Sequence, residues 1–103
     1  MKEKLVRDAI PSIIAREKGK VEYRKLSNQS EEYYKFLKNK LQEEVDEYFE
    51  SDAIIEIADI YEVIINILNY RNIPLNEFEK IIEYKRYKKG SFNCGFCMKF
   101  EDQ

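Results

Sequence analysis

The 103-residue chain contains no histidine, and it has only two cysteines, three glycines and two prolines. Without histidine there is no imidazole for acid–base catalysis, no serine–histidine triad and none of the usual histidine-containing zinc sites. Two cysteines without a secretory signal indicate a reducing compartment rather than a disulfide-stabilised secreted domain. These absences exclude most histidine-dependent enzyme classes.

The sequence also lacks a long uninterrupted apolar run. Residues 1–8 have no apolar core of the kind found in signal peptides, and the most apolar stretch, residues 53–68, contains Glu56, Asp59 and Glu62. The net charge of −2 provides no overall positive field that would attract nucleic acid. We therefore expect a cytoplasmic protein with no membrane and no nucleic-acid partner.

Local signals predict a single, mainly α-helical domain over residues 1–103. Capping residues, glycines and the break at residues 72–74 delimit four predicted helices. The first runs over about 11–17, the second from a capping box at Asn28 and Glu31 to about 50, the third over about 53–71, and the last from a cap at Asn76 with Glu79 to 89. Two other segments, residues 20–26 and 92–100, alternate in polarity and predict short strands that would pair with each other. The expected fold is a helical bundle with a small β appendage.

Acidic side chains lie on apolar faces of the two central helices. At 100° per residue, Glu44 falls inside the apolar stripe of the first helix, and Glu47 lies at its edge. Glu56 and Asp59 form a polar line on the second helix, again at a spacing of three residues that brings side chains together.

A chain reversal at residues 51–52 would place Glu47 opposite Glu56 and Glu44 opposite Asp59. Four facing carboxylates repel one another, and a hard divalent cation removes that conflict. Magnesium suits an all-oxygen site without histidine or thiolate. The alternative is that these acids are simply solvated, as acids on highly charged helices commonly are.

The last predicted helix carries cations along its apolar stripe. Lys85 and Lys89 continue the stripe of Phe78, Ile81 and Ile82, and Arg86 lies beside them. Such cations are suited to the outer oxygens of a magnesium-bound polyphosphate. The alternative is that they complement the helix dipole or extend from the apolar surface into water.

Three blocks of sequence resemble one enzyme superfamily. EEVDE at 43–47 followed by EIAD at 56–59 is similar to the EExxE…ExxD pattern of MazG-like all-α nucleoside triphosphate pyrophosphohydrolases. KLVRDAIP at 4–11 and KRYKKGSF at 85–92 resemble the small phosphoribosyl-ATP pyrophosphohydrolase-like branch of that group. The resemblance covers about residues 4–92.

The resemblance implies Mg²⁺-dependent attack of water on the α-phosphorus of a nucleoside triphosphate, which yields the monophosphate and pyrophosphate. It implies metal binding by Glu44, Glu47, Glu56 and Asp59, and a catalytic role for Glu43 together with Glu44. Glu43 would either support the metal ligands from outside or orient the attacking water. Lys85, Arg86 and Lys89 would contact phosphates. Arg7 would either do the same or pair with Asp8 or another acid.

The resemblance leaves the substrate open. Only eight residues, 48–55, separate the two acidic motifs, which leaves no room for an inserted loop that would shape a nucleobase pocket. The leading expectation is a house-cleaning enzyme for nucleoside triphosphates. The alternatives are phosphoribosyl-ATP hydrolysis in histidine biosynthesis and a non-catalytic nucleotide-binding module.

Two remaining features concern assembly and the cysteines. The 53–71 helix is apolar round most of its circumference. A single chain of this size has too few other helices to cover that apolar surface, so we expect a homo-oligomer, at least a dimer. Cys94 and Cys97 supply only two thiolates, so a closed zinc site would need a second copy. In a strand they would point to opposite faces, which disfavours a shared metal or a disulfide.

Overall fold

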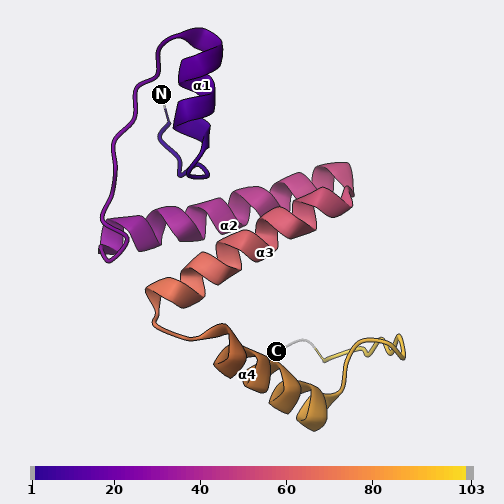
Figure 1. The fold of residues 1–103 in the computed structure, drawn as a ribbon. Helices are drawn as coiled ribbons and strands as arrows, with labels where there is room; N and C mark the ends of the chain where they lie inside the picture. Colours follow the sequence, from indigo (N-terminus) through magenta and orange to yellow (C-terminus); the bar gives the residue numbers. More distant parts are fainter. Residues whose placement is uncertain (1, 102–103) are drawn as a thin grey trace. The chain divides into compact units, whose positions relative to one another are not determined.

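The computed structural model describes residues 2–101. It contains four α-helices, α1 (Ile10–Lys18), α2 (Glu31–Ser51), α3 (Ile54–Tyr70) and α4 (Leu75–Lys89), as Figure 1 shows. The predicted mainly-α class is confirmed. No helix in the described part of the chain combines the length and the apolar character needed to cross a membrane. The chain divides into two compact units, Met1–Asn72 and Ile73–Gln103, which are described separately.

The first unit is built on an antiparallel hairpin of α2 and α3 (Figure 1). The reversal occurs at Asp52, which adopts the left-handed conformation with φ 56°, a region that Asp tolerates better than most residues. The Asp52 N–H donates to the Tyr48 carbonyl at 2.8 Å, and the Ala53 N–H donates to Ser51 Oγ at 3.1 Å. The predicted reversal is therefore confirmed.

The seam between α2 and α3 contains the most buried side chains of this unit. Leu37, Val63 and Leu68 are 2%, 8% and 7% exposed. Val63 belongs to the same face of α3 as the predicted acidic line, so that line points toward α2. The other face of α3 stays open, with Ile54 79% and Tyr61 51% exposed.

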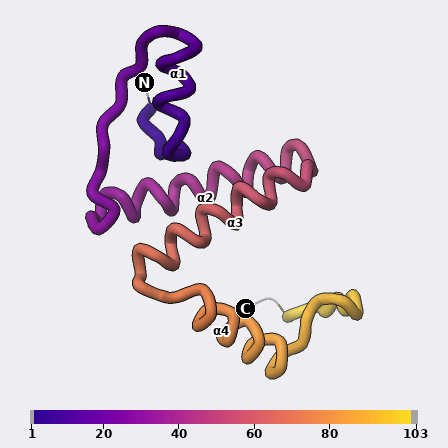
Figure 2. The backbone as a smooth tube through the Cα atoms, viewed as in Figure 1, coloured from indigo at the N-terminus to yellow at the C-terminus, as the bar shows by residue number. Residues whose placement is uncertain are grey.

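The N-terminal part of this unit is held mainly by polar contacts. Helix α1 has a proline in its first turn and ends at Gly19 with φ 74°, as the sequence predicts. Residues 20–26 form no strand, and Figure 2 shows them as a single extended path. Arg24 holds this segment by pairing with Glu3 at 2.8 Å and with Glu32 at 2.9 Å.

The second unit contains α4 and the C-terminal tail. Helix α4 follows Pro74, an extended residue without a side-chain cap, and stops at Gly90 with φ 80°. In the tail, the Gly95 N–H donates to the Phe92 carbonyl at 3.2 Å, and Gly95 has φ 70°. This turn interrupts the alternation, so residues 92–100 form no strand either. The predicted β appendage is wrong in both of its segments.

The conformation of the tail also sets the positions of the two cysteines. Cys94 and Cys97 are free and exposed, and Cys94 lies within the Phe92–Gly95 turn. The expectation that they point to opposite faces of a strand no longer applies, because there is no strand here.

Candidate metal centre

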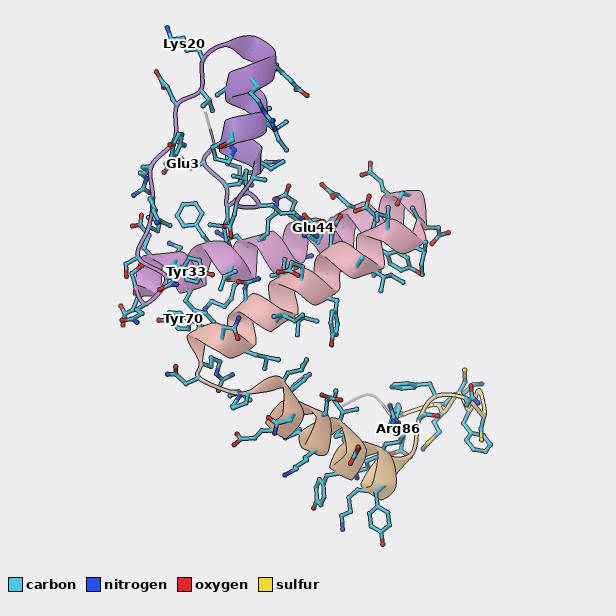
Figure 3. The ribbon with its side chains drawn as sticks, viewed as in Figure 1. Glu3, Lys20, Tyr33, Glu44, Tyr70 and Arg86 are labelled. Atoms are coloured by element: carbon cyan, nitrogen blue, oxygen red, sulfur yellow. The ribbon has the colours of Figure 1, made fainter. Side chains whose placement is uncertain are left out.

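Glu44 is the only charged side chain among the described residues that is buried, with 6% of its surface exposed. It lies on α2 toward α3 (Figure 3). Its Oε1 is 3.4 Å from Lys40 Nζ, whereas its Oε2 is buried without a hydrogen-bond partner. A buried acceptor without a partner is costly, so this oxygen points to a missing donor or cation.

The other carboxylates of the predicted site gather around Glu44 in two overlapping groups. Glu43 and Glu47 form the first group with it, and Glu56 and Asp59 form the second. In each group, one oxygen per carboxylate lies within 4.8 Å of the others. The hairpin thus brings the four predicted metal ligands into one neighbourhood, with Glu44 common to both groups.

Burial and like charge both act on the carboxylates of this cluster. Burial, reinforced by the negative charge of Glu47, raises the pKa of Glu44. The pKa of Glu56 is raised most by partial desolvation and next by the negative charges of Glu47 and Asp59. A raised carboxyl pKa means that the charged form is disfavoured here, which a bound cation would reverse.

Glu43 lies in a different electrostatic environment. Its carboxylate accepts from Lys4 Nζ at 2.8 Å and from Lys40 Nζ at 3.4 Å. Partial burial opposes its ionisation, but these two ammonium groups hold the Glu43 pKa below its usual value. Glu43 is therefore a carboxylate that stays charged beside others that resist charging.

Arg7 reaches the cluster from the N-terminal segment. Its Nη2 donates to Asp59 Oδ1 at 2.6 Å, so Arg7 pairs with a predicted metal ligand rather than with Asp8. This contact bridges 52 positions of sequence. It brings a guanidinium, a group that binds carboxylate and phosphate alike, to the edge of the acidic cluster.

Sequence reasoning missed two cations of this centre. Lys40 was detectable, since it precedes Glu43 and Glu44 by three and four residues on one helix. Lys4 was not, because nothing local indicates that the N-terminal segment crosses over α2.

The remaining predicted phosphate-binding residues belong to the second unit. Lys85, Arg86 and Lys89 are all exposed on α4, toward its C-terminal end. Ile81 and Ile82 on the same helix are also exposed, at 54% and 38%, so the predicted apolar stripe is not buried within this chain. The cations are available for an anion, and their role stays a prediction.

The donor set fits a hard divalent cation. Every candidate ligand is a carboxylate oxygen, the preferred ligand type of Mg²⁺, and the centre contains no thiolate or imidazole. The orphaned Oε2 of Glu44 lies where the two groups share a member. Comparisons with protein-family models, with curated proteins and with solved structures found no match.

Proposed function

We propose that the protein is a Mg²⁺-dependent nucleoside triphosphate pyrophosphohydrolase, which converts an NTP or dNTP to the monophosphate and pyrophosphate. The observation that carries this proposal is Glu44, a buried carboxylate with one oxygen unpartnered and further carboxylates around it. Solvated surface acids do not adopt this arrangement, because burying an unpaired carboxylate is costly.

Four residues would hold the metal: Glu44, Glu47, Glu56 and Asp59. When bound, Mg²⁺ would acidify a coordinated water and neutralise charge on the phosphates. Glu43 adjoins this set and stays ionised beside Lys4 and Lys40, so it is suited to orient the attacking water as a hydrogen-bond acceptor.

Arg7 is suited to bind a phosphate of the substrate. In the structure its guanidinium satisfies Asp59, which is part of the proposed metal site. A cation at Asp59 would compete with that ion pair, and the released guanidinium would then lie next to the phosphates. Contacts of Lys85, Arg86 and Lys89 with the phosphates are proposed from the sequence alone.

A homo-oligomer, at least a dimer, is part of the same proposal. It is supported by the open face of α3, where Ile54, Ile57 and Tyr61 repeat at helical spacing and are 79%, 42% and 51% exposed. An apolar stripe of this kind is usually covered by another helix. We expect Ile57→Lys to lower the assembled fraction in sedimentation velocity, and an unchanged distribution would contradict this interface.

The central experiment is a nucleotide panel with Mg²⁺ and detection of pyrophosphate. We expect turnover of several nucleoside triphosphates by the natural chain. Turnover of phosphoribosyl-ATP alone would assign the enzyme to histidine biosynthesis, and nucleotide binding without turnover would make it a non-catalytic module.

A matched pair of variants tests the site itself. Glu44→Gln removes the charge that a metal needs, and we expect activity to fall by about 100-fold or more, because even partners of metal ligands cost about 10- to 100-fold. Glu50→Gln makes the same change at an exposed position in the last turn of α2 and should leave activity unchanged. Equal activities of the two variants would overturn the metal site.

A further inference from the structure

A second polar region lies at the end of the hairpin that is farthest from the turn. It is a pocket of about 560 Å³ between the start of α2 and the end of α3. Tyr33 and Tyr70, at this end of the hairpin, are labelled in Figure 3. The volume is within the range of small-molecule sites. None of the acidic residues of the candidate metal centre lines it.

The lining is neutral and rich in amides. Seven residues form it, five with carboxamide side chains and two with phenol rings. Three of the amides come from the end of the hairpin: Asn66 and Asn69 lie on α3, and Asn72 lies just after it. Asn72 has φ 58°, a left-handed conformation that Asn adopts more readily than most residues, and its N–H donates to the Asn69 carbonyl at 3.1 Å.

Aromatic packing shapes the wall of the pocket. The ring of Tyr70 stacks on Tyr34 with centroids 4.6 Å apart and an interplanar angle of 2°. Tyr33 lies 6.2 Å from Tyr70 at an angle of 42°. Tyr34 covers one face of Tyr70, which holds that ring in a fixed orientation beside the amides.

The chemistry of this lining indicates the kind of ligand. Carboxamides carry a donor and an acceptor side by side, and aromatic rings offer a flat apolar surface. A nucleobase presents both complements, hydrogen-bonding groups on its edge and a π face. A phosphate or another charged ligand finds no ionic partner here, because no charged side chain lines the pocket.

The pocket and the carboxylates lie on one face of α3. Asp59 and Asn66 are seven residues apart, which is two helical turns and about 10 Å along the axis. Val63, which is buried, lies between them on that face. A nucleotide spans a distance of this order between its phosphates and the far edge of its base.

We propose that this pocket binds the base of the nucleotide whose phosphates reach the carboxylates, and that it prefers adenine or cytosine to uracil. The exocyclic amino group of adenine or cytosine donates to a carboxamide oxygen, and the neighbouring ring nitrogen accepts from a carboxamide N–H. Uracil has a carbonyl oxygen in place of that amino group. The inference rests on the proposed function for the position of the phosphates, but not for the binding of the base.

Asn66 is already oriented for such a role. Its Nδ2 donates to the Glu62 carbonyl at 2.9 Å and to Glu62 Oε2 at 3.0 Å. These bonds leave its Oδ1 free to accept from an exocyclic amino group. Asn69 is exposed, so its amide can turn toward a ligand.

The test measures nucleoside binding without phosphate and without metal, so it does not depend on hydrolysis. Adenosine, cytidine, guanosine and uridine are titrated into the full chain while the Asn side-chain amide signals are followed by NMR. We expect adenosine or cytidine to shift the amide signals of Asn66 and Asn69 and to bind more tightly than uridine. Equal binding of uridine would overturn the base preference.

Variants locate the binding. Asn69→Ala changes an exposed side chain and should weaken adenosine or cytidine binding about tenfold, the effect of one lost bidentate contact. Asn39→Ala is the matched control, an exposed asparagine on α2 outside the pocket, and should bind as the natural chain does. If both variants bind nucleosides equally well, the pocket is not the base site.

Hydrolysis separates this inference from the proposed function. In the Mg²⁺ assay, Asn69→Ala should raise KM with little change in kcat, because base contacts stabilise ground and transition states alike. Glu44→Gln should abolish turnover and keep nucleoside binding. Turnover that Asn69→Ala does not alter would overturn the base site alone. Nucleoside binding at the pocket in a chain without turnover would overturn the pyrophosphohydrolase alone.

Discussion

The two ends of the α2–α3 hairpin differ in the polar groups that the same pair of helices encloses. Near the turn, the seam holds a buried carboxylate, its acidic neighbours and the cations of Lys4, Arg7 and Lys40. At the far end, the space between the helices is lined by neutral amides and tyrosines. One end is therefore suited to ions and the other to an uncharged planar group.

This difference shows how one supersecondary element supports two kinds of chemistry. Charged groups near the turn are close enough to interact strongly, because partial burial reduces screening by water. The far end keeps its hydrogen-bonding groups uncharged, so they can discriminate by geometry without a large desolvation cost. The buried residues Leu37 and Val63 separate the two regions along the seam.

The largest expected effect comes from making the acidic end resemble an apolar seam. Glu44→Leu should abolish Mg²⁺-dependent activity and should raise the free energy of unfolding of the metal-free protein by about 1–3 kcal/mol, because it removes a buried unsatisfied acceptor. Urea denaturation in the presence of a chelator measures the stability. A destabilised Glu44→Leu protein would show that the carboxylate already has its partner.

A change on α3, across the seam from Glu44, should lower the affinity for the metal. Asp59→Asn leaves the shape of the side chain but removes a charge, and we expect the affinity for Mg²⁺ to fall by about 10- to 100-fold. The measurement is the Mg²⁺ dependence of the thermal midpoint. Asp46→Asn, at an exposed position of α2, is the control. If both variants respond to Mg²⁺ as the natural chain does, Asp59 is not a ligand.

The two ends should also differ in their response to pH. Because the pKa values of Glu44 and Glu56 are raised, these groups take up protons above the usual carboxyl value of about 4.3, and protons then compete with Mg²⁺. The stabilisation by Mg²⁺ should decline as the pH falls from neutrality toward that value. The metal-free protein should gain stability from these two groups over the same range, since the folded state binds their protons more tightly.

Nucleoside binding at the amide pocket should change little over that pH range, because none of its lining amides titrates. Titrations of adenosine at the two ends of the range check this directly. A parallel loss of Mg²⁺ stabilisation and nucleoside binding would mean that the two ends are not independent.

At the far end, the aromatic pair should contribute a modest amount of stability. Tyr34→Leu removes the ring that stacks on Tyr70, and we expect a loss of about 1 kcal/mol with no change in the response to Mg²⁺. Thermal unfolding with and without Mg²⁺ measures both quantities. An altered response to Mg²⁺ would contradict the separation of the two regions.

The smallest effect is expected outside both regions. Arg24 is half exposed and pairs with Glu3 and Glu32 at the surface, so Arg24→Ala should lower the thermal midpoint only slightly. Its thermal midpoint should approach that of the natural chain at high salt, where such pairs are screened. A larger loss would show that this segment positions the N-terminal residues of the metal centre.

Sequence reasoning performed best where structure follows from neighbours along one helix. The spacing of Glu44 within an apolar stripe correctly predicted its burial, and the break at residues 51–52 predicted the reversal. It failed for the two strands, because alternation in a short segment, weak in residues 20–26 and strict in 92–100, is overridden by the ion pairs of Arg24 in the first and by a turn at Gly95 in the second. The sequence does not decide between the possible partners of Arg7, because the ion pair that it forms with Asp59 joins residues far apart in the chain.

The sequence by itself determined the four helices, the reversal after Ser51 and the register that sets one acidic pair against the other, because these depend on helical periodicity and local backbone preferences. Only the tertiary structure decided that Lys4 and Arg7 reach the carboxylates, that Glu44 keeps one oxygen unpartnered, and that amides preceding α2 and amides of α3 line one pocket. Those features depend on which distant segments meet, and short-range patterns carry no such information.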